Sequence, residues 1–243
     1  MFSFRALGRH LGAASLAGIV AGVVVAGVLG RIAMRVSGFT SRPELIGMET
    51  GNGNRVGDIT LAGTVGLALF VGITAGIGGG VLYASAEPWL RSRRWKGVIF
   101  GVALLAALGV TVLDPSSFDF KRFGLAPLNV GMFAAMFVAF GVAIAWLFDH
   151  IRGAIDGTGP VATGLEIVAW LSALGAGALS ALIFLSFGGL DDLVPVMLFA
   201  AAGLIPPVVR WRGLPRSVAY AAFGIPFVVG ALRTLSGISQ ILG

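Results

Sequence analysis

The chain has 243 residues, of which 57% are hydrophobic and 12% are charged, and its mean hydropathy is +0.95. A soluble globular domain carries about 25% charged residues, so this composition excludes a soluble enzyme and a nucleic-acid-binding module. The lack of cysteine also excludes a disulfide-stabilised secreted scaffold. The net charge is +6, but we expect the partner of so apolar a chain to be the lipid bilayer and not a nucleic acid.

Seven apolar stretches follow one another along the sequence. They cover residues 11–30, 59–83, 97–113, 128–148, 164–187, 193–209 and 217–235. A helix that crosses the ~30 Å hydrocarbon core of a bilayer needs about 20 apolar residues, and stretches of about 17 to 25 residues suffice. The runs lack the period-two alternation of barrel strands. The sequence therefore predicts an all-α, polytopic transmembrane helical bundle of about seven spans, with residues 1–243 forming one integral-membrane domain.

The first apolar stretch follows Arg5 and Arg9. It is longer than the h-region of a cleaved signal peptide, which has about 7–15 residues, so we interpret it as a retained signal-anchor helix. Basic clusters at 91–96 and 210–212 follow the second and sixth stretches, and both lie in the cytoplasm if the N-terminus does. The positive-inside rule therefore predicts a cytoplasmic N-terminus in a multi-pass protein of the plasma (inner) membrane.

Small residues recur at four-residue spacing in three of the stretches. The main positions are Gly18 and Gly22 in the first stretch, Gly72, Gly76 and Gly80 in the second, and Gly177 in the fifth. Such a face lets another helix backbone approach closely when lipid supplies no hydrophobic driving force. Two interpretations remain open: these faces pack against each other within the chain, or they dock another membrane subunit or a second copy.

Two arginines, Arg31 and Arg35, follow the first apolar stretch at a spacing of four residues. We expect both to lie near the outer interface, where a long arginine side chain can extend toward water. The alternative is that the two guanidinium groups form a site for an anion or a lipid headgroup. The glycine- and asparagine-rich loop at 36–58 is either a turn-rich connection or an external lid.

Residues suited to catalysis are scarce in the spans. The spans contain neither cysteine nor histidine, and the P-loop and nucleophile-elbow motifs are missing from the chain. Glu166 lies three residues after Thr163, which favours a helix-capping role over proton relay. We therefore expect no enzyme activity, no metal site and no cofactor.

Proline is the remaining signal in the C-terminal part of the chain. Pro195 lies near the start of the sixth stretch, Pro206 and Pro207 lie near its end, and Pro226 lies in the middle of the seventh stretch. Each proline removes a backbone donor and interrupts helical hydrogen bonding. Interrupted helices form gates and solute sites in transporters, although proline also occurs in ordinary membrane helices.

Two functional hypotheses follow from these patterns. The first is a membrane subunit or scaffold that acts by packing its helices against partners. The alternative is a small-solute transporter or channel that uses the proline-containing sixth and seventh spans. An ion-coupled carrier usually keeps a carboxylate inside its spans, and this chain places almost all of its carboxylates outside the apolar stretches, which favours the first hypothesis.

Overall fold

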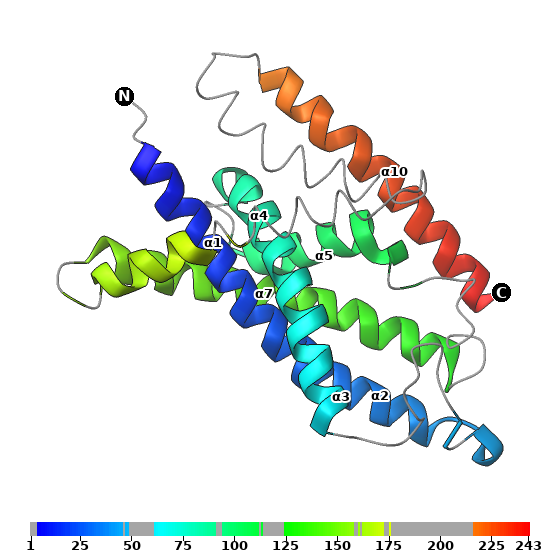
Figure 1. Cartoon of the computed structure of the whole chain (residues 1–243). Coiled ribbons are helices and arrows are strands. Elements are labelled where there is room, and N and C mark those ends of the chain that lie inside the picture. Colours follow the sequence, from blue (N-terminus) through cyan, green and yellow to red (C-terminus); the bar gives the residue numbers. More distant parts are fainter. Residues whose placement is uncertain are drawn as a thin grey trace.

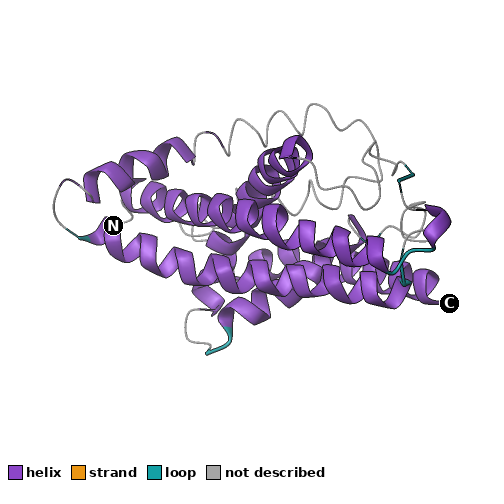
Figure 2. Cartoon of the chain, turned by 90° about the horizontal axis from the view of Figure 1, so that it is seen from below, coloured by secondary structure: helices purple, strands orange, loops and turns teal. Residues whose placement is uncertain are grey.

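The computed structural model describes residues 4–45, 47–48, 61–90, 94–111, 113, 124–157, 160, 162–172, 175 and 216–243. Every regular element in this part of the chain is a helix (Figure 2). Three helices are long and apolar enough to cross a membrane, namely Gly8–Phe39, Gly63–Leu90 and Ala126–Asp156. Shorter apolar helices cover Lys96–Leu108, Ala162–Ser172 and Phe227–Leu242. The helical prediction is thus confirmed, and the length and composition of the three longest helices fit a membrane protein.

The first helical rod joins three elements end to end. These are α1 (Phe4–Val24), the π-helical η1 (Val25–Leu29) and α2 (Gly30–Phe39). The rod therefore extends well beyond both ends of the expected span 11–30. It ends at Thr40, whose hydroxyl donates a hydrogen bond to the carbonyl of Val36 at 3.0 Å and so satisfies one of the terminal acceptors. A short 3₁₀ turn, η2 (Pro43–Leu45), follows.

The second rod has the same composite form. It consists of α3 (Leu61–Gly66), the π-helical η3 (Leu67–Gly72) and α4 (Ile73–Leu90), and so continues past the expected end at residue 83. The two π-helical segments lie against each other, and a Cβ atom added to Gly27 would lie 3.2 Å from the Cβ of Ala68. Each π-helical segment alters the phase of its helix, so both rods change register where they meet.

The remaining described elements are α5 (Lys96–Leu108), the 3₁₀ turn η4 (Gly109–Thr111), α7 (Ala126–Asp156), a helix over 162–172, and α10 (Arg216–Leu242). Proline in the first turn of α7 suits a helix start, because its missing N–H would have no helical acceptor there. Helical geometry continues through Pro226 in α10. Proline is tolerated in membrane helices when neighbouring groups satisfy the freed carbonyl.

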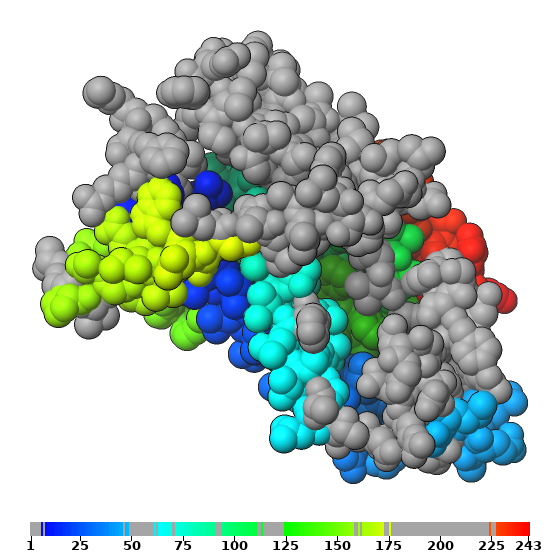
Figure 3. Space-filling model, in the orientation of Figure 1, coloured from blue at the N-terminus to red at the C-terminus, as the bar shows by residue number. Residues whose placement is uncertain are grey.

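The helices pack as antiparallel pairs (Figure 1). Increasing residue numbers along α1 meet decreasing numbers along α4, and α5 and α7 are related in the same way. Helix α10 runs alongside α5, where the backbone of Ala107 contacts Gly230. The space-filling view shows the first rod (blue) between the helix over 162–172 (yellow-green) and the second rod (cyan) (Figure 3).

The apolar core lies where α1, α4, α5 and α7 meet. Tyr83 and Phe148 are its largest fully buried side chains, and Phe100 packs edge-on against Tyr83 with ring centroids 5.0 Å apart. Alanines of α1 fill the space beside these rings, among them Ala13, Ala14, Ala17 and Ala21. Small residues on α1 thus allow large aromatic residues on the neighbouring helices to be buried beside it.

Several expected features lie outside the described residues. These are the sixth span at 193–209, the fifth span beyond residue 175, Gly177, Pro206 and Pro207, and most of the loop from residue 49 to residue 60.

Candidate functional site

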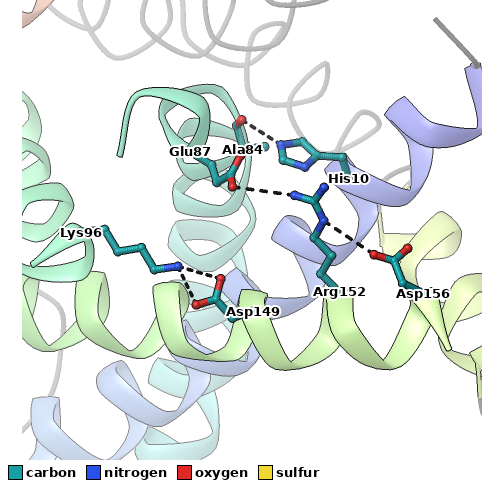
Figure 4. Close-up of polar contacts among 7 residues, drawn as sticks. All are labelled: His10, Ala84, Glu87, Lys96, Asp149, Arg152 and Asp156. Atoms are coloured by element: carbon teal, nitrogen blue, oxygen red, sulfur yellow. Dashed lines mark hydrogen bonds and ion pairs between the residues drawn. The ribbon is translucent and has the colours of Figure 1, made fainter. Parts of the chain in front are cut away.

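Charged side chains from five helices, namely α1, α4, α5, α7 and the helix over 162–172, gather at one end of the bundle; Figure 4 shows part of this cluster. Antiparallel packing brings the N-terminal ends of α1 and α5 to the same side as the C-terminal ends of α4 and α7. The cluster, which we call the polar clasp, contains three cations and four carboxylates: Arg9, Lys96, Arg152, Glu87, Asp149, Asp156 and Glu166. It is the largest gathering of ionisable groups in the described part of the chain and is therefore the candidate site.

Glu87 is the most deeply buried carboxylate of the polar clasp. Its side chain is 8% exposed and lies on the last turn of α4. The guanidinium of Arg152 on α7 approaches it, with Nη1 3.7 Å from Oε1, and also lies 5.8 Å from the centre of the Phe148 ring. A buried carboxylate is costly unless it is paired, so the contact with Arg152 offsets part of the cost of burying Glu87 and ties α7 to α4.

Arg9 links α1 to two other helices. Its Nη2 donates a hydrogen bond to the carbonyl of Ile155 and lies 3.5 Å from an oxygen of Asp156, both on α7. Its Nε lies 3.9 Å from Glu166 on the helix over 162–172. The same helix packs on α1, because a Cβ added to Gly8 would collide with the indole ring of Trp170. Arg9 therefore fixes the N-terminal end of α1 electrostatically at the place where Trp170 also packs against it.

Lys96 and Asp149 form a more exposed pair than Arg152 and Glu87. The ammonium lies 2.5 Å and 2.7 Å from the two carboxylate oxygens, and the Asp149 side chain is 52% exposed. Exposed pairs of this kind contribute at most about 1 kcal/mol. The pair joins the start of α5 to α7, but we expect it to contribute less to stability than the pair of Glu87 with Arg152.

His10 lies between the polar clasp and the aromatic core. Its Nε2 is 3.0 Å from the carbonyl oxygen of Ala84, and its ring packs edge-on against Phe148 at a centroid distance of 5.2 Å. Tyr83, fully buried beneath, packs edge-on against Phe148 as well. The charged groups thus lie next to the buried aromatic rings. The ion pairs join helix ends that the aromatic core already holds together.

The chemistry available to the polar clasp is that of an ion-pair network. Every carboxylate in it faces a cation, so the network neutralises charge at the end of the bundle. Among the residues that the structure describes, no group of three or more His, Asp or Glu side chains is arranged to hold a metal ion.

Five of the glycines singled out in the sequence lie in one contact, between the two rods. A Cβ atom on Gly18 or Gly22 of the first rod would collide with the carbonyl oxygen of Gly76 or Gly72, respectively. A Cβ on Gly80 would lie 2.5 Å from the carbonyl oxygen of Ala14. These glycines thus face each other within the chain, and the contact leaves their shared face no room for another subunit.

A second contact of the same kind joins α5 to α7 and was missed in the sequence. A Cβ on Gly101 would lie 2.6 Å from the carbonyl oxygen of Phe137, and one on Gly97 would lie 2.7 Å from the Cα of Val142. Gly141 on α7 lies directly against Gly97 and Gly101. The four-residue spacing of Gly97 and Gly101 was a usable signal, because it matches the spacing on the first two stretches.

Arg31 and Arg35 lie in different environments, contrary to the expectation that both extend toward water. Arg31 is only 7% exposed, and its Nη1 lies 3.8 Å from the sulfur of Met34. Arg35 is exposed and lies over the ring of Phe39 at 5.6 Å. The difference arises because the first rod is packed against its neighbours at this level, where Leu67 approaches Gly30.

Most of the polar clasp was not predicted from the sequence. The expected fourth span ended at residue 148, so Asp149, Arg152 and Asp156 were placed in a loop, whereas α7 continues to Asp156. Their spacing of three and four residues places them on one face of such a helix and was the available signal. Glu166 was assigned to a helix cap, but helical geometry already includes residues 162 and 163, and Glu166 pairs with Arg9.

Comparison with known proteins finds no match: neither a family model, nor a curated protein, nor a solved structure is similar to this chain.

Proposed function

We propose that the chain is a non-catalytic integral membrane protein of the plasma (inner) membrane that serves as a helix-packing subunit or scaffold. The observation that carries this proposal is an apolar ridge on the outer face of the first rod. It consists of Val20, Val24, Val28 and Ile32, which are 40%, 52%, 54% and 54% exposed. The opposite face of the rod carries the glycines and alanines that pack on α4.

The shape of the ridge supports a protein partner. Its members follow one another at intervals of four residues, and rows of this spacing fit the grooves of a facing helix in the commonest class of helix packing. Each member is β-branched and has one strongly preferred rotamer in a helix, so packing it costs little side-chain entropy. The glycine contacts within the chain hold this ridge on a rod that is already anchored to α4 and α7.

The proposal includes seven spans with the N-terminus in the cytoplasm and the C-terminus outside. The polar clasp supports this orientation, because it gathers Arg9, Lys96 and Arg152 at the end of the bundle that holds the N-terminal end of α1. Positive charge concentrates on the cytoplasmic side of membrane proteins. A topology reporter fused after Gly243 is expected to read outside, and one fused after residue 91 is expected to read inside. A cytoplasmic reading at Gly243 would contradict the seven-span topology.

Native mass spectrometry of the full chain, extracted gently from its own membranes, tests the subunit proposal. We expect a stoichiometric protein partner or a second copy. The double variant Val24→Ala, Val28→Ala removes the centre of the ridge and is expected to lower the amount of retained partner several-fold. The double variant Val228→Ala, Leu232→Ala removes side chains of α10 that are at least as exposed, and it is expected to retain the partner. Equal retention by both variants would show that the ridge is not the docking surface.

The alternative proposal is a small-solute transporter or channel that uses the helices expected at 193–209 and 217–235. It draws on Pro226, which lies within α10 and deprives the carbonyl of Ala222 of its helical donor. A lone monomer that conducts solutes in liposomes, with flux changed by Pro226→Ala and unchanged by Pro88→Ala in α4, would replace the subunit proposal. Absence of flux together with a bound partner would support the subunit.

A further inference from the structure

An open groove lies between α4, α5 and α10. Its volume is about 360 Å³, near the lower end of the ~300–1,000 Å³ typical of ligand sites. Leu82 and Trp89 of α4 form one wall, Ile99, Ala103 and Ala107 of α5 form the floor, and Phe227 of α10 forms part of the other wall. Trp89, Ile99 and Phe227 are exposed, so they mark a rim that is accessible from the surface of the bundle.

The lining of the groove is apolar. Aliphatic and aromatic side chains line it, and the indole N–H of Trp89 is the polar side-chain group among the residues that form its walls. Hydrogen bonding of a hydrophilic solute along such walls would be poor, and the solute would lose its hydration on entry. A hydrocarbon chain gives up no hydration or hydrogen bonds when it enters the groove from lipid. It makes the same apolar contacts there as in lipid and gains the close packing of a preformed surface.

The depth of the groove matches one leaflet of a membrane. Ile99 and Ala107 are eight residues apart on α5, which corresponds to about 12 Å along the helix. Half of the hydrocarbon core is about 15 Å deep. The shallow end of the groove, at Trp89 and Ile99, adjoins the connection between α4 and α5, so the groove extends from that end of the bundle toward the membrane centre.

The connection at the shallow end carries an available positive charge. Arg94 and Trp95 are exposed, and the Arg94 guanidinium lies 5.8 Å from the centre of the Trp95 ring. Lys96, next in sequence, is engaged by Asp149, whereas Arg94 forms no ion pair with any carboxylate in the described part of the chain. An exposed arginine beside a tryptophan at the end of a helix is suited to the level of lipid headgroups.

We propose that the groove binds one acyl chain of an anionic phospholipid from the leaflet at the polar-clasp end, with the phosphate of the headgroup held by Arg94. The apolar walls select a hydrocarbon chain, the depth selects one leaflet, and the exposed guanidinium of Arg94 selects a negative headgroup. This inference requires only that the helices lie in a membrane, and it holds for a subunit and for a transporter alike.

The test is lipid retention by the full chain in nanodiscs that contain equal amounts of phosphatidylglycerol and phosphatidylcholine, measured by native mass spectrometry after release into detergent. We expect one retained phosphatidylglycerol per chain. Ala103→Phe fills the floor of the groove and is expected to abolish this retention. Val102→Phe places the same side chain at the neighbouring position of α5, which is exposed and does not line the groove, and is expected to retain the lipid. Equal retention by the two variants would overturn the proposal.

Arg94→Gln tests the headgroup contact separately. One basic residue near a membrane surface contributes about 1 kcal/mol of attraction to anionic lipid, so the preference for phosphatidylglycerol is expected to fall about fivefold. An unchanged preference would refute the role of Arg94.

A measurement on the wild-type protein keeps the proposal testable if Ala103→Phe misfolds. A phosphatidylglycerol with brominated acyl chains is expected to quench the fluorescence of Trp89, which is measured as the difference between the wild type and Trp89→Phe. Lack of this quenching would also overturn the proposal.

Discussion

The Gly76→Leu variant is expected to lose the contact between the two helical rods and to aggregate on extraction. A Cβ at this position would collide with the carbonyl oxygen of Gly18 and lie 2.9 Å from the Cα of Ile19. These neighbours are backbone atoms, so they cannot move aside as a flexible side chain could. Overpacking of a tight interior typically costs about 1–3 kcal/mol, and a clash with a helix backbone is expected to reach or exceed the upper value.

The measurement is the melting temperature followed by tryptophan fluorescence, together with the size-exclusion profile in mild detergent. Gly131→Leu on α7 is the matched control, because nothing lies within 4 Å of a Cβ there. We expect the control to keep a single symmetric peak and the melting temperature of the wild type. If Gly76→Leu is as stable as Gly131→Leu, the close contact between α1 and α4 is wrong.

The second large effect is expected when Arg152 is replaced by alanine. This change removes the guanidinium that faces the buried Glu87 and leaves a carboxylate that is only 8% exposed without that cation. Removing one partner of a fully buried pair costs about 3–5 kcal/mol, and because Arg152 itself is 38% exposed we expect a loss of stability nearer ~2 kcal/mol. Lys96→Ala removes a cation from the more exposed pair and is expected to cost at most about 1 kcal/mol.

A double-mutant cycle separates the ion pair from the packing of Arg152 on Phe148. Glu87→Gln removes the negative charge and keeps the shape, so in that background Arg152→Ala is expected to cost much less than in the wild type. The free energies of unfolding of the four proteins in detergent give the coupling. A coupling near zero would mean that Arg152 stabilises the helix ends through its contact with Phe148 and its pair with Asp156 alone.

Much of the helical architecture follows from the sequence because hydropathy acts along the chain. A run of apolar residues such as 128–148 must be helical in lipid, where unpaired backbone groups are costly, and α7 contains this run in full. The ends of the helices were predicted less well. The predicted apolar stretches at 59–83 and 128–148 end before the next charged residue, whereas backbone hydrogen bonding continues past it, so α7 reaches Asp156 and α4 reaches Leu90.

The site was predicted less completely than the fold, because it depends on contacts between distant residues. The four-residue spacing of Gly72, Gly76 and Gly80 determined that one face of the helix would accept a close neighbour. It did not determine which helix that neighbour would be. Only the tertiary structure places Gly18 and Gly22 against that glycine face. It also buries Arg31 while leaving Arg35 exposed, and it brings Arg152 to Glu87. The physical reason is that local periodicity defines the faces of each helix, whereas the pairing of faces depends on the fit of all the helices together.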